Sequence, residues 1–187
     1  ISEGLTPEEL VQLLNEYLTA MCDIISSHNG TIDKFEGDAI IAFWGAPLDL
    51  PDHATVACYA AIEMQQRNEE MRQMLREQNR PLLFTRMGLN SGPVVVGNMG
   101  SADRMDYTMM GDVVNLAARL EGANKFYKTF TMVSGSTYEL AKDDIDSRQL
   151  DIIRVVGKKE PVHVYEVLAR KNETSSEISG VVEQYLK

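Results

Sequence analysis

The sequence has few cysteines, few basic residues and no long apolar run. Its two cysteines, Cys22 and Cys58, cannot build a disulfide framework, so we expect two free buried thiols in a reducing compartment. No apolar run approaches the roughly 20 residues that a membrane-spanning helix needs. Basic residues number 18 against 28 acidic ones, and the resulting net charge of -10 argues against non-specific binding to nucleic acid or anionic membranes. These absences favour a cytoplasmic domain and leave room for a membrane anchor elsewhere in a larger protein.

What is present is ordinary for a globular protein. Hydrophobic residues make up 44% of the 187 residues and charged residues 25%. This length fits one domain with a substantial core. The chain opens at Ile1 without an initiator methionine, so we read it as a piece of a longer protein.

The first third of the sequence predicts a helix followed by a hairpin. Thr6, Pro7 and Glu9 form a capping-box pattern, and Gly30 ends the apolar helical periodicity that follows. Two β-type runs, Thr31–Phe35 and Ala39–Trp44, then flank a Gly-Asp turn, which is typical of a hairpin.

The remaining sequence alternates helical and β-type patterns. Asp52 is the expected cap of a second helix, whose charged later part we expect to be solvated. The further predicted elements are this helix (His53–Gln78), a strand pair (Leu82–Leu89 with Val94–Val96), a loop (Gly97–Asp103), a short strand (Tyr107–Met109), a helix (Asp112–Asn124), a strand (Thr131–Val133), a helix (Ser136–Lys142), a final strand pair (Ile152–Val156 with Val162–Leu168) and a polar tail from Asn172. Because hairpins imply antiparallel pairing, we predict an α+β sandwich of the ferredoxin-like kind, with helices on a largely antiparallel sheet.

Two residues at the first hairpin could take part in chemistry. Asp38 sits at its tip beside Gly37, where a carboxylate can bind Mg²⁺, a cation that prefers oxygen ligands. The alternative is that Gly-Asp only makes the turn. Lys34, on the strand entering the turn, can donate a hydrogen bond to a ring nitrogen of a base, or it can simply protect an edge strand.

Other candidates lie in the second half. Asn115 and Arg119 are four residues apart on an otherwise apolar helix and therefore share a face. Arginine suits phosphate through its several donors, whereas the alternative is an internal ion pair or a helix packing contact. Lys158 follows Gly157 between two strands and is either a mobile cation at a site or part of a solvated turn.

Four motifs stand out along the sequence, and they are the segments Asp33–Pro47, Arg86–Gly92, Tyr107–Glu121 and Gly157–Val167. In this order, they resemble the catalytic domain of class III adenylyl and guanylyl cyclases. The resemblance covers about residues 1 to 168. We therefore assign residues 1–170 to a cyclase catalytic domain and residues 171–187 to a C-terminal tail that could form a short helix.

The resemblance implies a role for each candidate. Asp38 would be one of two aspartates that bind two Mg²⁺ or Mn²⁺ ions. The other roles it implies are contact with the purine (Lys34, Thr108), orientation of the ribose (Asn115), stabilisation of developing phosphate charge (Arg119) and contact with the triphosphate (Lys158 and, less directly, Arg86). Each site would be shared between two chains of a homodimer, with regulatory or membrane domains elsewhere in the parent protein.

The resemblance also bears on the substrate. Lysine donates to the ring-nitrogen acceptor of adenine, and a threonine hydroxyl can accept from its 6-amino group. Lys34 and Thr108 therefore predict an adenylyl cyclase that prefers ATP to GTP, and Thr108 resembles the subgroup that includes bicarbonate-responsive enzymes. A guanylyl cyclase is the alternative. A diguanylate cyclase is disfavoured because Glu36-Gly37-Asp38-Ala39 replaces its GGDEF-type hairpin.

In one respect the sequence departs from the family pattern. The first metal-binding aspartate of the family lies on a strand just before the segment that opens at Ile1, so this chain retains Asp38 alone. We therefore expect an incomplete domain that lacks its first strand, binds metal poorly and turns over slowly. The alternative function is a nucleotide-binding or regulatory dimerisation module without activity.

Overall fold

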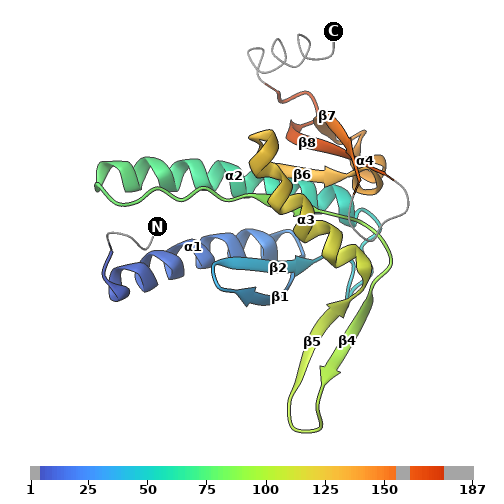
Figure 1. Ribbon diagram of the computed structural model, residues 1–187, viewed down its shortest axis with the longest axis horizontal. Coiled ribbons are helices and arrows are strands. Elements are labelled where there is room, and N and C mark those ends of the chain that lie inside the picture. The colour runs from blue at the N-terminus through green and yellow to red at the C-terminus, as the bar shows by residue number, and fades with distance from the viewer. Residues whose placement is uncertain (1–4, 155–160, 175–187) are drawn as a thin grey trace. The chain divides into compact units, whose positions relative to one another are not determined.

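The computed structural model describes residues 5–154 and 161–174 of the chain. These residues form two compact units, each of which is described separately. The first unit contains the described residues up to Thr85 together with Val95–Met110, and the second contains Arg86–Val94 and the described residues from Gly111 onward. Figure 1 shows the elements that make up each unit.

Helix α1, Pro7–Ser27, begins as the sequence predicts. The Thr6 hydroxyl accepts from the Glu9 backbone N–H at 3.2 Å, and the Glu9 carboxylate accepts from the Thr6 N–H at 2.8 Å. This reciprocal pair satisfies two backbone donors that would otherwise lack partners. The buried face of the helix comprises Leu13, Tyr17, Met21, Ile24 and Ile25.

Helix α2, His53–Glu77, matches its predicted span, but the predicted side-chain cap at its start is absent. Asp52 has φ -95° and ψ 22° and makes no side-chain cap hydrogen bond, because that backbone is not in the extended conformation that capping needs. The charged later part is largely solvated, as predicted, because most of its charged side chains are exposed, and Arg72 is the exception. Arg72 there is 8% exposed, and its guanidinium donates to the Glu69 carboxylate at 2.7 Å and to the Leu83 carbonyl at 3.2 Å.

The segment before residue 87 is not the strand that its apolar residues suggest. Side chains of α2 take up its carbonyl groups: Arg72 Nη1 donates to Leu83, and Gln65 Nε2 donates to Thr85 at 3.0 Å. These side chains satisfy carbonyls that would otherwise need a neighbouring strand. The predicted pairing of residues 82–89 with 94–96 is therefore wrong, and only Met87–Leu89 forms a strand, β3.

The first unit contains two hairpins. Strands β1, Thr31–Glu36, and β2, Ala39–Phe43, pair antiparallel as predicted. Strands β4, Val95–Gly100, and β5, Met105–Met110, form the second hairpin, so the loop predicted over 97–103 is confirmed only at its tip. Hairpin β1–β2 contacts both α1 and β5, and Figure 1 shows it beside the C-terminal part of α1.

The second unit is built on a four-stranded sheet of order β3-β6-β8-β7. Its further strands are β6 (Thr131–Ser134), β7 (Ile145–Ile153) and β8 (Val162–Arg170). Only β3 and β6 are parallel, and the other pairs are antiparallel. The prediction started the β7 strand at Ile152, but the strand begins seven residues earlier because polar residues pair with β8 there. Residues 155–160 and the tail beyond 174 lie outside the described residues.

The described part of this unit also contains two helices, α3, Asp112–Tyr127, and α4, Gly135–Ala141. Leu116 and Leu120 of α3 are buried against Met132 of β6 and Val164 of β8. Gly88 lets β3 approach α3 closely, since a Cβ there would lie 2.2 Å from the Ala117 carbonyl oxygen. The domain therefore has the predicted α+β class, and in this unit the helices pack against a largely antiparallel sheet. No helix in the described part is long and apolar enough to cross a membrane.

Candidate nucleotide site

Lys34 and Thr108, both predicted to contact a purine, lie together in the first unit. The Lys34 Nζ donates to the Thr108 Oγ1 at 3.1 Å. Thr108 is 9% exposed, whereas the Lys34 side chain is 45% exposed. The pair is therefore anchored at a buried hydroxyl and open at the ammonium group, where a ligand can reach it.

Asp33 is the third member of this cluster, and the sequence assigned no role to it. Its Oδ2 accepts a 3.0 Å hydrogen bond from the Thr108 hydroxyl and lies 3.5 Å from the Lys34 Nζ. The Asp33 side chain is only 3% exposed. Its other oxygen, Oδ1, is buried and has no hydrogen-bond partner within the described residues.

A β-bulge explains how adjacent residues reach one hydroxyl. Successive side chains of a regular strand point to opposite faces of the sheet. In β1 the register shifts between Ile32 and Lys34, so that Asp33 has no partner on β2. An inserted residue of this kind re-aims neighbouring side chains. The bulge therefore allows Asp33 and Lys34 to meet at Thr108.

Asp38, the predicted metal ligand, is exposed at the turn between β1 and β2. Gly37 before it has φ +65°, a conformation that glycine adopts without strain. Burial raises the pKa of the Tyr17 phenol on α1; the hydrogen bond from Thr85 opposes this shift, and the Asp38 charge adds a smaller upward contribution.

The position of Asp38 suits a partial metal site, in which the protein supplies few of the ligands. The described residues contain no cluster of three or more histidine, cysteine, aspartate or glutamate side chains that could hold a metal. Magnesium commonly uses one or two carboxylates and completes its shell with water and substrate phosphates. An exposed carboxylate at a turn suits such a partial site and does not suit a closed protein cage.

In the second unit, α3 presents Asn115 and Arg119 on its exposed side, while Leu116 and Leu120 face the core. Within the described residues, no ion pair or hydrogen bond engages the Arg119 guanidinium. The alternative of an internal ion pair is therefore not seen for the part of the chain described. The two side chains are available to a ligand or to another protein chain.

Two asparagines that the sequence did not single out as functional hold α3 in place. Asn90 Nδ2 donates to the Val113 carbonyl at 2.9 Å, and its Oδ1 accepts from the Ser134 hydroxyl at 2.6 Å. Asn124 is fully buried, and its Nδ2 donates to the Met87 carbonyl at 2.9 Å. These bonds tie both ends of α3 to β3 and therefore set the position of Asn115 and Arg119.

The family to which the chain belongs is shown by a match over nearly its whole length. Residues 1–169 match the family model described as adenylate and guanylate cyclase catalytic domain. The chain belongs to this family. Its resemblance to class III cyclases, first visible in four short motifs, thus extends over nearly the whole sequence.

Relatives of known name agree with this assignment. The cyclase domain is 39% identical over 168 residues to adenylate cyclase 1 of Rhizobium meliloti, covering 90% of this chain and 25% of that protein. It is 34% identical over 176 residues to adenylate cyclase of Anabaena cylindrica, covering 90% of this chain and 34% of that protein. The chain thus spans a quarter to a third of the length of these two relatives.

Solved structures of both cyclase types resemble the domain. The adenylyl cyclase CyaB from P. aeruginosa matches with a TM-score of 0.84 and 38% identity, covering 93% of this chain and 89% of that one. The guanylyl cyclase Cya2 matches with a TM-score of 0.81 and 37% identity, covering 92% and 86%. Such similar values mean that overall likeness does not separate ATP from GTP, so the choice depends on individual side chains.

Arg86 and Lys158 are the two remaining residues predicted to contact the triphosphate. Arg86 Nε lies 3.2 Å from Glu121 Oε1 in a half-exposed ion pair, so contact with a phosphate would compete with this pair. Lys158 lies outside the described residues.

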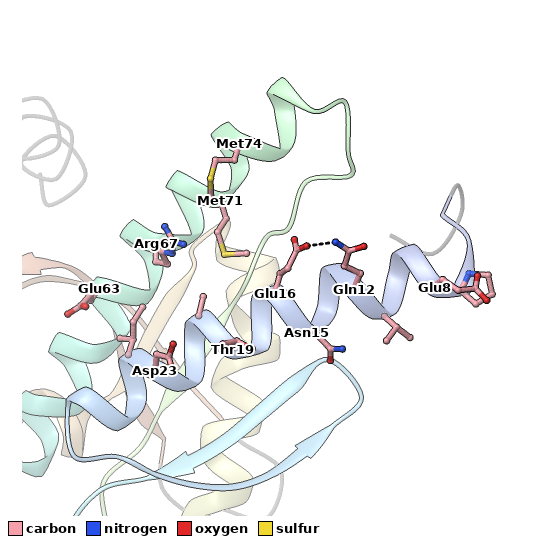
Figure 2. Close-up of a pocket in the computed structure, with 14 residues that line it drawn as sticks. Glu8, Gln12, Asn15, Glu16, Thr19, Asp23, Glu63, Arg67, Met71 and Met74 are labelled. Carbon is pink, nitrogen blue, oxygen red and sulfur yellow. Dashed lines mark hydrogen bonds between the residues drawn. The ribbon is translucent and has the colours of Figure 1, made fainter.

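A surface groove of the first unit is lined by other residues. It has a volume of about 1300 Å³ and runs between α1 and α2, where Gln12, Glu16, Arg67 and Met71 are among its lining residues (Figure 2). None of the predicted site residues in the described part of the chain lines it. Polar side chains such as Asp23, Glu63 and Arg67 line the groove, but its residues are not those expected to contact the nucleotide.

Proposed function

We propose that this domain converts ATP to 3′,5′-cyclic AMP and pyrophosphate. The observation that carries the proposal is the hydrogen bond between Lys34 and Thr108, because it joins the two residues expected to select the base. The adenylate cyclase names of the two bacterial relatives support the same substrate.

Base selection follows from donors and acceptors. The Lys34 ammonium donates to a ring nitrogen of adenine, and the Thr108 hydroxyl accepts from the 6-amino group. Guanine carries a donor at that ring nitrogen and an acceptor in place of the amino group. A site that pairs well with adenine therefore leaves polar groups unpaired against guanine, which is costly when they are buried.

The reaction is an internal phosphoryl transfer. The ribose 3′-oxygen forms a bond to the α-phosphorus as the bond to the bridging oxygen of pyrophosphate breaks, and the 3′-hydroxyl proton is released. Asn115 orients the ribose, while Arg119 and Lys158 stabilise the charge that grows on the phosphate oxygens. Both Arg119 and Asn115 are exposed on α3, as a ligand-binding role requires.

Asp38 would hold Mg²⁺ or Mn²⁺ at this site. A bound divalent ion supplies charge neutralisation at the phosphates and lowers the pKa of the attacking hydroxyl. A homodimer would complete each site, with the metal-binding aspartate from one copy and Lys34, Thr108, Asn115 and Arg119 from the other. Apart from the buried Thr108, these side chains are exposed, which is compatible with such sharing.

GTP is the competing substrate, since the similar guanylyl cyclase Cya2 acts on it by name. Assay of the intact protein with ATP or GTP and Mg²⁺ or Mn²⁺ tests the proposal. We expect cyclic AMP as the main product. Removing the charge-assisted hydrogen bond with Lys34→Met should lower kcat/KM for ATP roughly 10- to 100-fold.

The matched control is Lys142→Met, which removes an exposed lysine paired with Glu139 on α4. It should leave kcat/KM unchanged. Comparable turnover of the two nucleotides by the unmodified protein would contradict the ATP assignment, and absence of any cyclic nucleotide would contradict the activity.

A further inference from the structure

Asp33 occupies an unusual position beneath the two residues proposed to select the base. It is the bulged residue of β1, its side chain is 3% exposed, and its Oδ2 accepts the Thr108 hydroxyl hydrogen at 3.0 Å. The same carboxylate lies 3.5 Å from the Lys34 ammonium. One buried carboxylate therefore touches both residues.

The hydrogen-bonding capacity of Thr108 shows what this contact does. A threonine hydroxyl has one hydrogen to donate and two lone pairs to accept with. Its hydrogen is directed to Asp33, and one lone pair receives the Lys34 N–H. What remains is a single lone pair, so toward a third group Thr108 can only accept.

Without Asp33, the same hydroxyl would be ambivalent. A hydroxyl hydrogen rotates to suit its surroundings, so an unrestrained threonine can accept from the amino group of adenine or donate to the oxo group of guanine. With its hydrogen held by Asp33, it meets the guanine oxygen as acceptor against acceptor. With Asp33 in place, the neutral Thr108 hydroxyl can only accept a hydrogen bond from the base, as an ionised aspartate side chain would.

The burial of Asp33 is not explained by a gain in stability from packing. Oδ1 of this carboxylate is buried without a partner in the part of the chain that the structure describes. Burying an unpaired polar atom is unfavourable, so this position contributes poorly to stability for its own sake. Its satisfied oxygen, in contrast, is aimed at Thr108.

We infer that Asp33 is a positioning residue for base selection, which acts by holding the Thr108 hydroxyl as an acceptor. The inference rests on the proposed function, because it concerns how the same site favours ATP over GTP. It adds to that function a residue that touches neither the base nor the phosphates.

The test uses Asp33→Asn, a substitution of nearly equal size, in the intact protein. An asparagine amide can accept from Thr108 or donate to it, so the hydroxyl regains its freedom. We expect the ratio of kcat/KM for ATP to that for GTP to fall roughly three- to tenfold, the range for one hydrogen bond. The change should appear in KM, with kcat for ATP and the melting temperature little altered.

Two further variants separate positioning from general damage. Thr108→Asp supplies a carboxylate that accepts whether or not Asp33 is present, so adding Asp33→Asn in that background should leave the nucleotide preference unchanged. Asp106→Asn removes an equal charge two residues from Thr108, on an exposed side chain of β5, and should also leave the preference unchanged.

Three results would overturn the inference. These are an unchanged preference in folded Asp33→Asn, an equal loss with ATP and GTP, and the same loss of preference in the Thr108→Asp background. Competition of ATP and GTP against a fluorescent ATP analogue measures the preference without turnover. A protein that binds ATP selectively but makes no cyclic AMP would therefore refute the proposed activity while still testing Asp33.

Discussion

The hydroxyl of Thr108 donates a 3.0 Å hydrogen bond to the carboxylate of Asp33, 75 residues earlier in the chain. The Lys34 ammonium completes the cluster at 3.1 Å from the same hydroxyl. Strand β5 thus brings one member, and the bulge in β1 brings the other two. In the proposed function, the preference for ATP depends on these three residues, of which only two would touch the base.

Arg119→Ala should reduce turnover without reducing stability. The side chain is exposed on α3 and makes no ion pair within the described residues, so little folding energy depends on it. Removing a donor that stabilises transition-state charge typically costs about 100- to 1000-fold in kcat. Steady-state kinetics with ATP and a thermal melt measure both effects. Lys125→Ala, an exposed lysine on the same helix, is the control and should keep kcat near that of the unmodified protein. If Arg119→Ala left kcat unchanged, Arg119 would have no part in the reaction.

Asp38→Asn should change the response to metal. Its exposed carboxylate at the hairpin turn is the proposed ligand of a divalent ion. Loss of the charge should raise the Mg²⁺ concentration needed for half-maximal activity by about tenfold or more, since a hydrogen-bonded charged group is worth at least ~1.5 kcal/mol. Titration of activity with Mg²⁺ and Mn²⁺ provides the measurement. Asp49→Asn, also exposed, should leave the titration unchanged, and an equal shift in both variants would argue against a specific site.

Gly88→Ala should destabilise the second unit. A Cβ at this position would lie 2.2 Å from the Ala117 carbonyl oxygen and 2.3 Å from the Glu121 backbone nitrogen, so β3 and α3 would have to separate. Overpacking of this kind costs about 1–3 kcal/mol or more. Urea unfolding measures the loss.

Gly122→Ala provides the matched substitution in the same unit. A Cβ there meets nothing within 4 Å, and Gly122 lies inside α3. Alanine is about 1 kcal/mol better than glycine in a helix interior, so this variant should be more stable. If the two substitutions had the same effect, close packing of α3 on β3 would not be the cause.

The free energy of unfolding should fall in alkaline solution because the Cys58 thiol is buried. Burial raises the pKa of its thiol from the ordinary 9.0 to about 12. The unfolded chain loses this proton first as the pH rises, so the contribution of Cys58 is complete below pH 9.0 and is lost between 9.0 and about 12. Urea unfolding across this range should show a smaller decline for Cys58→Ala than for the unmodified protein. The native thiol should also resist iodoacetamide until the protein unfolds, and rapid labelling of the folded state would contradict its burial.

Local sequence was sufficient wherever neighbouring residues decide the conformation. The capping box of Thr6 and Glu9 set the start of α1, and the Gly37–Asp38 turn set the first hairpin. It was insufficient for residues 82–96. Asn90 to Pro93 resemble a hairpin turn, yet β3 pairs with β6, and β4 pairs with β5. The carbonyls of Leu83 and Thr85 bond to α2 side chains far away in sequence, which no local pattern reveals.

The sequence by itself therefore determined the family, the α+β class and the candidate residues, because each of these depends on residue types and their spacing along the chain. Tertiary structure alone decided which of them meet. Asp33 carried no sequence signal of its own, since its proposed role depends on a bulge that turns two successive side chains toward one hydroxyl. A strand's ordinary alternation would have sent Asp33 and Lys34 to opposite faces, and only the packing of β1 against β5 brings Thr108 to both.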